Sequence, residues 1–202
     1  MQNNEKKKER RTKKELEDML WKTLEKQIIE KGVNNITIRG LAKEAGFEPL
    51  VIYNRFKDMD DLLENYARRY DYWLNDISNI KKKNTPCENF KKILTSLINN
   101  LYDNEIMQRV LLWELNDTHR ITRRIAQIRE ISNAELIEHF KQNDFDGAAS
   151  ILVAGIYYLI MHRKISTFCD IDYNSPQGKE TMIKAVENMV NRFFAMQPNE
   201  IK

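Results

Sequence analysis

Four polar side chains stand close together at the end of one short apolar segment. The segment GLAKEAGFEPLVIYNRF covers residues 40–56 and ends in Tyr53, Asn54 and Arg55, with Lys57 directly after it. Phenol, amide, guanidinium and ammonium groups donate hydrogen bonds, and the two cations also attract anions. These side chains are candidates for binding a polar or anionic partner if the fold holds them on one surface.

Residues typical of catalytic and metal sites lack the spacing that such sites need. His119, His139 and His162 are scattered, and Cys87 and Cys169 form no Cys-x-x-Cys pair. The sequence has no Gly-rich phosphate loop, nucleophile elbow or paired-carboxylate motif. We therefore predict that the protein is not an enzyme and binds no metal or cofactor. Two lone cysteines fit a reducing cytoplasm.

Composition favours an all-helical fold. The chain has 202 residues, of which 42% are apolar, with only six Gly and four Pro. Apolar residues recur at spacings of three and four, and no sustained alternation of apolar and polar residues indicates a sheet. This content is sufficient to bury a core in one large domain or two smaller ones.

Charge is divided unevenly along the chain. Residues 1–57 carry 14 Lys or Arg against 9 Asp or Glu, a net +5, whereas residues 58–202 carry 19 against 21, a net −2. Most of the excess lies in KKKERRTKK, Lys6–Lys14. The division predicts a polyanionic partner for the N-terminal part alone. For the lysine run by itself, a solvated tail that aids solubility is the alternative.

The periodicity predicts about nine helices in four segments of chain. A flexible basic arm at 1–11 precedes a domain at 12–57, a connecting helix at 58–80 and a second domain at 81–202, with KKKNTP (81–86) as the clearest break. Gly32, Gly46, Pro49 and Asp58 are typical helix stops and starts. The predicted helices cover 12–31, 37–45, a short stretch from Pro49, a long helix from Asp58, 87–102, 105–116, 121–143, 146–166 and 177–196.

Two short helices around Gly46 suggest a helix-turn-helix. Helices of about nine residues are marginal in water, so packing on the first and fourth helices must hold them. A helix, a tight Gly-containing turn and a crossing second helix can place that second helix in the DNA major groove. Val51, Ile52 and Phe56 are expected to face inward. Leu50, Tyr53 and Asn54 are expected to face the groove and its walls, with Arg55 as a further candidate.

Residue identity strengthens this interpretation. The stretches GVNNITIRGLAKEAGF (32–47) and IYNRFKDMDDLL (52–63) resemble the DNA-binding domain of the tetracycline-repressor (TetR) family, and the resemblance covers about residues 16–66. It implies a homodimeric, all-helical transcriptional regulator, usually a repressor, that a small molecule releases from double-stranded operator DNA. The later helices fit the family in number and order but carry no motif of their own.

The resemblance also implies two kinds of DNA contact. The expected phosphate contacts are Thr37, Arg39, Tyr53 and Lys57, and the expected base contacts are Pro49, Leu50 and Asn54. An Asn side chain can pair with adenine through two hydrogen bonds, and Leu or Pro can meet a thymine methyl group. The basic arm would lie along phosphates or reach the minor groove.

Three positions depart from the family pattern. Glu48 stands where a small hydroxyl residue commonly caps the third helix, Leu50 replaces a frequent Gly, and Met59 replaces a common Lys. Glu caps poorly and is repelled by phosphate. These departures leave the operator sequence open. If the arm compensates, deleting Met1–Arg11 weakens binding to all DNA and flattens its salt dependence.

In the second domain, the resemblance implies an effector pocket among the middle helices. Candidate lining residues are the bulky side chains on apolar faces: Trp113, Tyr158, Phe90, Met107, His119 and Met161. Their apolar character predicts a hydrophobic or aromatic effector. Ordinary packing is the alternative for each residue, and the existence of an effector stays open.

The last two helices are expected to form the dimer interface. The expected contacts are Leu152, Gly155, Leu159, Val186, Met189 and Phe193, in a two-fold symmetric four-helix bundle. A monomer core is the alternative. The apolar run 148–161 has 14 residues, fewer than the roughly 20 that cross a bilayer, so no membrane partner is expected.

The sequence thus predicts a DNA-binding regulator in the cytoplasm, because the charged segment after the basic start lacks the pattern of an export signal. The competing hypothesis is a non-catalytic helical adaptor that binds protein and carries a degenerate DNA-binding module.

Overall fold

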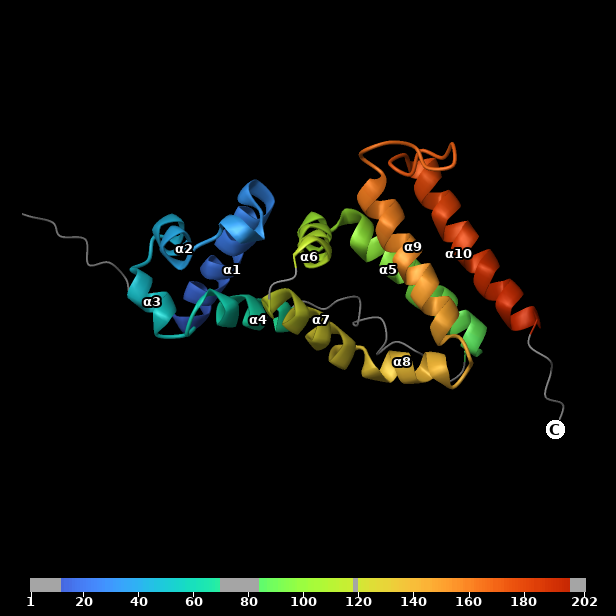
Figure 1. The fold of residues 1–202 in the computed structure, drawn as a ribbon, viewed down its shortest axis with the longest axis horizontal. Helices are drawn as coiled ribbons and strands as arrows, with labels where there is room; N and C mark the ends of the chain where they lie inside the picture. The colour runs from blue at the N-terminus through green and yellow to red at the C-terminus, as the bar shows by residue number, and fades with distance from the viewer. Residues whose placement is uncertain (1–11, 70–83, 118–119, 197–202) are drawn as a thin grey trace, which may run out of the picture. The chain divides into compact units, whose positions relative to one another are not determined.

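The computed structural model describes residues 12–69, 84–117 and 120–196, and Figure 1 shows their helices in chain order. The chain divides into two compact units, Met1–Tyr66 and Ala67–Lys202. The division falls within α4 (Met59–Arg69), so the first turns of the predicted connecting helix group with the N-terminal unit.

The N-terminal unit places three short helical segments after one long helix. α1 (Lys13–Lys31) is followed by the 3₁₀ turn η1 (Val33–Asn35), α2 (Ile38–Ala45), α3 (Pro49–Tyr53) and the start of α4. Thr12 and Glu15 form a capping box at the start of α1, with each backbone N–H donating to the other side chain. Gly46 ends α2 in the left-handed conformation at φ 70°, which glycine adopts without a Cβ clash.

A shared apolar core holds these short helices in place. Leu24 and Leu41 are fully buried, Ile52 is 1% exposed, and the Trp21 ring meets the Phe56 ring edge-on at 5.6 Å. Helices of five and eight residues do not persist alone in water. Burial of each large apolar side chain, worth about 1.5–3 kcal/mol, therefore keeps α2 and α3 folded.

The C-terminal unit is a bundle built around α5. Its helices are α5 (Pro86–Asp103), α6 (Glu105–Asn116), α7 (Arg120–Ser132), α8 (Ala134–Lys141), α9 (Asp146–His162) and α10 (Pro176–Met196). α5 packs against both α9 and α10, and the three helices lie side by side in Figure 1. Gly178 allows the loop before α10 to fold back closely, because a Cβ there would collide with the carbonyl of Asp172.

Stacked aromatic rings fill one end of this bundle. The Phe90 ring of α5 stacks on that of Phe145 at 4.7 Å with an interplanar angle of 10°, and the Phe140 ring meets Phe90 edge-on at 4.8 Å. Phe193 and Phe194 of α10 complete the cluster with rings 4.9 and 5.7 Å from that of Phe145. The cluster joins α5, α8 and α10 through ring packing, which adds to the stability given by burial.

The predicted all-α fold class is confirmed. The described part of the chain forms ten α-helices and one 3₁₀ turn, with a single isolated bridge and no strand. The predicted bounds of the first, second, fifth, sixth and last helices agree with the structure to within one residue. Helix starts and stops were predictable here because Thr, Gly and Pro mark them chemically.

Two expectations about helices need correction. The single helix predicted at 121–143 is wrong, because the chain breaks between α7 and α8 at Asn133. The backbone N–H of Asn133 donates to Arg129 and Glu130, and its side-chain Nδ2 also donates to Arg129 O at 3.0 Å. Asn competes for backbone hydrogen bonds in this way and so ends helices without Gly or Pro. The helix predicted at 146–166 is also too long, because α9 ends at His162.

Some predictions fall outside the described residues: the basic arm at 1–11, the part of the fourth helix beyond Arg69, and His119. Among the helices that are described, none combines the length and the apolar character that crossing a membrane requires.

Candidate nucleic-acid interface

The start of α2 presents two exposed side chains beside backbone donors. The Gly40 N–H donates to Thr37 Oγ1 at 3.1 Å, which confirms Thr37 as the N-cap. Thr37 and Arg39 are both exposed. The first N–H groups of a helix have no intrahelical acceptor, and the helix dipole makes this end positive. The start of α2 can therefore hold an anion such as a phosphate.

α3 exposes one edge and buries the other. Leu50 is 66% exposed, Tyr53 is 48% exposed and Asn54 is exposed, whereas Ile52 is 1% exposed. Pro49 occupies the first helical position and is half-buried. The exposed edge combines an apolar side chain, a phenol and an amide, which together suit the edges and methyl groups of bases in a major groove.

Carboxylates fix the backbone at the start of α4. The Lys57 N–H donates to Asp61 Oδ2 at 2.9 Å, and the Asp61 N–H donates to Asp58 Oδ1 at 2.8 Å. The second bond confirms Asp58 as the cap of the fourth helix. Lys57 itself is exposed, so its backbone is fixed while its ammonium group stays in solvent.

The side chain of Glu48 does not cap α3. This agrees with the expectation that Glu is a poor N-cap residue. It occupies the N-cap position with φ −74° and ψ 137°, but its side chain makes no capping hydrogen bond. The residue is exposed, directly before Pro49 and Leu50. An unengaged carboxylate therefore stands in solvent at the N-terminal end of the exposed edge of α3.

A polar junction between α1 and α2 was missed by the sequence analysis. The buried Gln27 of α1 donates through Nε2 to Glu44 Oε2 at 2.6 Å, and Lys26 Nζ lies 2.8 Å from Glu44 Oε1. Hydrogen bonds from Lys26 and Gln27 lower the pKa of Glu44 below its ordinary value. The one available signal was a polar Gln27 beside the apolar stripe of Leu24 and Ile28.

All seven predicted DNA-contact residues lie in α2, α3 and the turns that adjoin them. All are exposed except the half-buried Pro49. Their roles in binding DNA stay predictions. The arrangement supplies hydrogen-bond donors, cations and apolar contacts, and these groups suit the phosphates and base edges of DNA.

The predicted effector residues are dispersed through the C-terminal unit. Phe90 and Met107 are buried in the core, at 0% and 3% exposed. Trp113 is half-buried and donates through Nε1 to Asp117 Oδ2 at 3.2 Å, and Met161 is half-buried. Tyr158 is 52% exposed, and its ring stacks on His162 at 5.3 Å.

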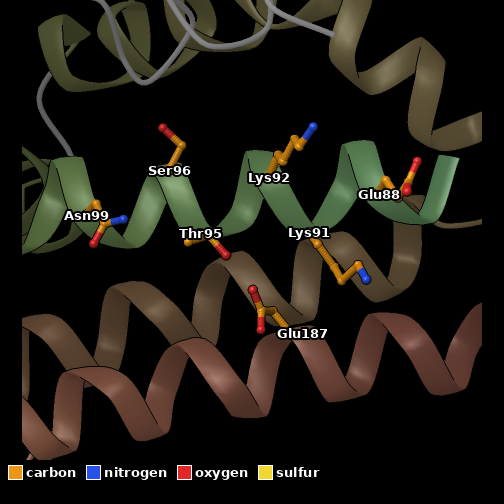
Figure 2. A pocket seen from close by; sticks show the side chains of 7 residues that line it. All are labelled: Glu88, Lys91, Lys92, Thr95, Ser96, Asn99 and Glu187. Carbon is orange, nitrogen blue, oxygen red and sulfur yellow. The ribbon is translucent and has the colours of Figure 1, made fainter. Parts of the chain in front are cut away.

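A groove of about 440 Å³ lined by polar and charged residues lies along α5, and none of the predicted effector residues lines it. Figure 2 shows Lys91 and Thr95 of α5 and Glu187 of α10 pointing into the space between the two helices, while Lys92 and Ser96 point to the other side of α5. Thr95 Oγ1 is buried and has no hydrogen-bond partner among the described residues. Glu88 and Asn99 complete the lining. Polar residues repeated at spacings of three and four resemble a solvated helix face, so sequence alone gave no reason to select them.

Most of the predicted dimer residues are accessible on α9 and α10. Gly155 is exposed and Met189 is 54% exposed, while Leu152, Leu159 and Phe193 are half-buried. Val186 is 5% exposed, so its side chain lies in the core of its own protomer and offers little surface to a second copy. Two further apolar side chains, Ile151 at 76% and Tyr158 at 52%, are exposed on α9.

In the described ranges, no group of three or more His, Cys, Asp or Glu residues is placed to hold a metal ion.

Comparison with protein families gives one match. Residues 22–66 match the model of a family described as bacterial regulatory proteins, tetR family. The matched segment includes most of α1, all of α2 and α3, and all seven predicted DNA-contact residues. No curated protein matches the sequence.

Solved structures share the fold along nearly the whole chain. The fatty acid degradation regulator FadR from Bacillus halodurans is 16% identical, with a TM-score of 0.68 over 93% of this chain and 99% of that one. A TetR-family transcriptional regulator from Haemophilus influenzae is 19% identical, with a TM-score of 0.61 over 89% and 98%. A TetR-like regulator from Rhodococcus sp. RHA1 is 13% identical, with a TM-score of 0.63 over 93% and 100%. At sequence identities of 13–19%, these similarities show that the fold is shared and nothing further.

Proposed function

Because this chain belongs to the tetR family of bacterial regulatory proteins, we propose that it is a homodimeric repressor that binds operator DNA and releases it on binding a small molecule. The chain is a transcriptional regulator with a DNA-binding fold of repressor type. The observation that carries the proposal is the exposed edge of α3, where Leu50, Tyr53 and Asn54 face solvent above a buried Ile52.

In the proposed complex, α3 lies in the major groove and the elements beside it hold the backbone. Pro49, Leu50 and Asn54 contact base edges, which carry the sequence information. Thr37 and Arg39 bind a phosphate at the start of α2, while Tyr53 and Lys57 bind phosphates on either side of α3. The exposure of these side chains and the positive N-terminal end of α2 support this assignment.

A gel-shift titration against fragments of the neighbouring genomic DNA tests the proposal. We expect retardation of particular fragments at a protein concentration that leaves the others free. Asn54→Ala should abolish this selectivity, whereas Asn174→Ala, which removes an exposed amide in the loop before α10, should not. Salt-sensitive retardation of every fragment alike would contradict the proposal and favour the adaptor hypothesis.

The proposed dimer is formed by α9 and α10 of two copies. Leu152, Gly155, Leu159, Met189 and Phe193 supply the contacts, together with the exposed Ile151 and Tyr158. Small and apolar side chains on adjacent helices permit a close, two-fold symmetric bundle. Such a dimer suits operator DNA, because two copies of α3 must reach successive major grooves about 34–36 Å apart.

The proposed effector binds in the C-terminal unit, as is typical of the family. The groove along α5 offers Lys91, Thr95 and Asn99 as hydrogen-bond donors beside the carboxylates of Glu88 and Glu187, which favours a ligand with polar groups of both donor and acceptor type. This differs from the hydrophobic or aromatic effector that the sequence predicts. Trp113 and Met161 stay candidates for the apolar ligand, because both are half-buried.

Release requires that the effector distinguish two states of the protein. α4 is continuous across the division between the two units, so a shift of α4 in each copy would alter the separation of the two DNA-binding units. An effector shifts this equilibrium only by its differential affinity for the two states. Equal effector affinity with and without operator DNA would therefore refute the coupling.

The adaptor hypothesis is not favoured, because the family match covers the residues of the DNA-binding domain itself. Members of this family are in general regulators that act by binding and not by catalysis. We place the proposed activity in the cytoplasm, where a bacterial regulator meets its DNA.

A further inference from the structure

Glu48 is an acidic side chain at the DNA-facing end of α3 with nothing in the described chain to neutralise it. It precedes Pro49 and Leu50, it is exposed, and it makes no capping hydrogen bond. The ion pairs of the N-terminal unit join other carboxylates: Lys26 pairs with Glu30 and Glu44, and Lys31 pairs with Glu44. The usual structural role of this position, capping the helix, is therefore unused.

The helix start gives Glu48 little to cap. Pro49 has no N–H, and the Val51 N–H already donates to the carbonyl of Glu48 at 2.9 Å. Glu is also a weak N-cap because its longer side chain does not reach the first turn well. The side chain is consequently free to extend away from α3 toward whatever the helix start approaches.

A carboxylate at the start of α3 interacts differently with the phosphates of DNA and with the amino groups of its bases. Phosphates repel it, so it adds nothing to backbone binding. In helix-turn-helix proteins the N-terminal residues of the recognition helix lie against base edges. Among major-groove groups, the N4 amino group of cytosine is the donor that a Glu carboxylate accepts from.

We propose that Glu48 determines operator specificity by accepting a hydrogen bond from cytosine N4 at one position in each half-site. The proposal rests on the proposed function, because it requires α3 in the major groove. It makes Glu48 a base-reading residue beside Pro49, Leu50 and Asn54. The carboxylate then lowers the affinity for every DNA sequence that lacks a cytosine at that position, because its charge stays unpaired there.

Selection from a randomised palindromic DNA library tests the proposal with the full-length protein. We expect the wild type to prefer C·G over the other pairs by about 5- to 150-fold at one position per half-site. Glu48→Gln should shift the preference there toward A·T, because an amide pairs with adenine N6 and N7. Glu48→Ser should lose the preference, with tighter binding only to sites that lack the cytosine, since a negative charge that stays unpaired there is removed.

Asp60→Asn is the matched control. It removes an acidic charge from the first turn of α4 in the same unit, so it should tighten binding to all sequences and leave every base preference unchanged. If wild type, Glu48→Gln and Glu48→Ser select the same base at every position, Glu48 does not read DNA and the inference is overturned. If the wild type itself selects no sequence, the proposed function fails, and the inference fails with it.

A single-atom substitution in the DNA checks the contact directly. Replacing the amino group of the selected cytosine by hydrogen should weaken wild-type binding by the same factor as Glu48→Ala does on the unmodified site. The two changes together should cost no more than either alone, because both remove one hydrogen bond. Fully multiplicative losses would show that Glu48 and this amino group do not interact.

Discussion

Tyr53 is a single exposed side chain that we expect to contribute to DNA binding and little to folding. Its side chain is 48% exposed on α3, while the core beneath is formed by Ile52 and Phe56. Tyr53→Phe should weaken binding to every DNA sequence by about 1–2 kcal/mol, a roughly 5- to 30-fold loss. Fluorescence anisotropy measures this loss. The thermal unfolding midpoint should stay the same, and unchanged DNA affinity would exclude a phenol–phosphate contact.

Glu44 is a residue whose contribution to folding should depend on pH. The Lys26 and Gln27 hydrogen bonds lower its pKa below the ordinary value of 4.5. Its stabilisation is therefore fully present above that ordinary value and is lost as pH falls through the lowered pKa. Glu44→Gln should melt earlier than wild type at about pH 6, and the difference should be smaller near pH 3, below the ordinary pKa of 4.5.

A control for this prediction removes a neighbouring carboxylate. Glu30 also lies near Lys26, at 3.8 Å, but both side chains are largely exposed, and such pairs contribute little. Glu30→Gln should melt close to wild type at either pH. If Glu44→Gln differs from wild type by the same amount at both pH values, the carboxylate of Glu44 does not act through its charge.

Residue type and spacing allowed the exposed residues of α3 to be predicted, but not the polar contacts between helices. Leu50 and Tyr53 follow from helical periodicity, because Ile52 must face the core. The Gln27–Glu44 hydrogen bond joins residues 17 positions apart, and nothing local in the sequence marks it. The same holds for the bidentate pair of Arg129 with Glu114, at 2.5 and 2.6 Å. Long-range polar pairs depend on tertiary packing, which a periodic pattern does not specify.

At the scale of elements, α3 shows how far packing replaces intrinsic helix stability. It has five residues, and Ile52 is its one fully buried side chain. Ile52→Ala should destabilise the N-terminal unit by about 2–5 kcal/mol, because it removes buried methyl groups and leaves a cavity. Urea unfolding followed by circular dichroism measures this change.

Leu50→Ala is the matched control on the same helix. Leu50 is 66% exposed, so its truncation should change the free energy of unfolding by less than about 0.5 kcal/mol. It should instead reduce operator affinity, whereas Ile52→Ala should reduce both stability and binding. Equal destabilisation by the two substitutions would mean that α3 does not pack as described.

The boundary between α7 and α8, which has neither Gly nor Pro, was the least predictable. α2 ends at Gly46 and α5 begins at Pro86, and both bounds follow from the sequence. α7 and α8 instead separate at Asn133, where side-chain and backbone hydrogen bonds to Arg129 replace a conventional stop. The choice between continuing and breaking a helix at an Asn depends on the packing of the following segment, and so on tertiary structure.

At the scale of the whole molecule, dimerisation determines whether two DNA-binding units can act on one operator. Gly155 gives the sharpest test, because it is exposed on α9 and a Cβ built there meets no atom within 4 Å of the same chain. A Cβ at this position therefore leaves the protomer undisturbed, and because Gly155 is exposed, the bulk of a larger side chain can extend into solvent. In the proposed interface, the same bulk would hold the two copies of α9 apart.

Gly155→Trp should shift the mass in sedimentation equilibrium from twice the 24.1 kDa of the chain toward one chain. Operator affinity should fall steeply, since each half-site then binds alone. Gly155→Ala should keep the dimer and gain roughly 0.5–1 kcal/mol of helix stability. A dimer that survives Gly155→Trp with unchanged operator affinity would place the interface elsewhere on the molecule. A Gly155→Ala variant that dissociates while its helix content is retained would instead show that the backbones at this position are in direct contact.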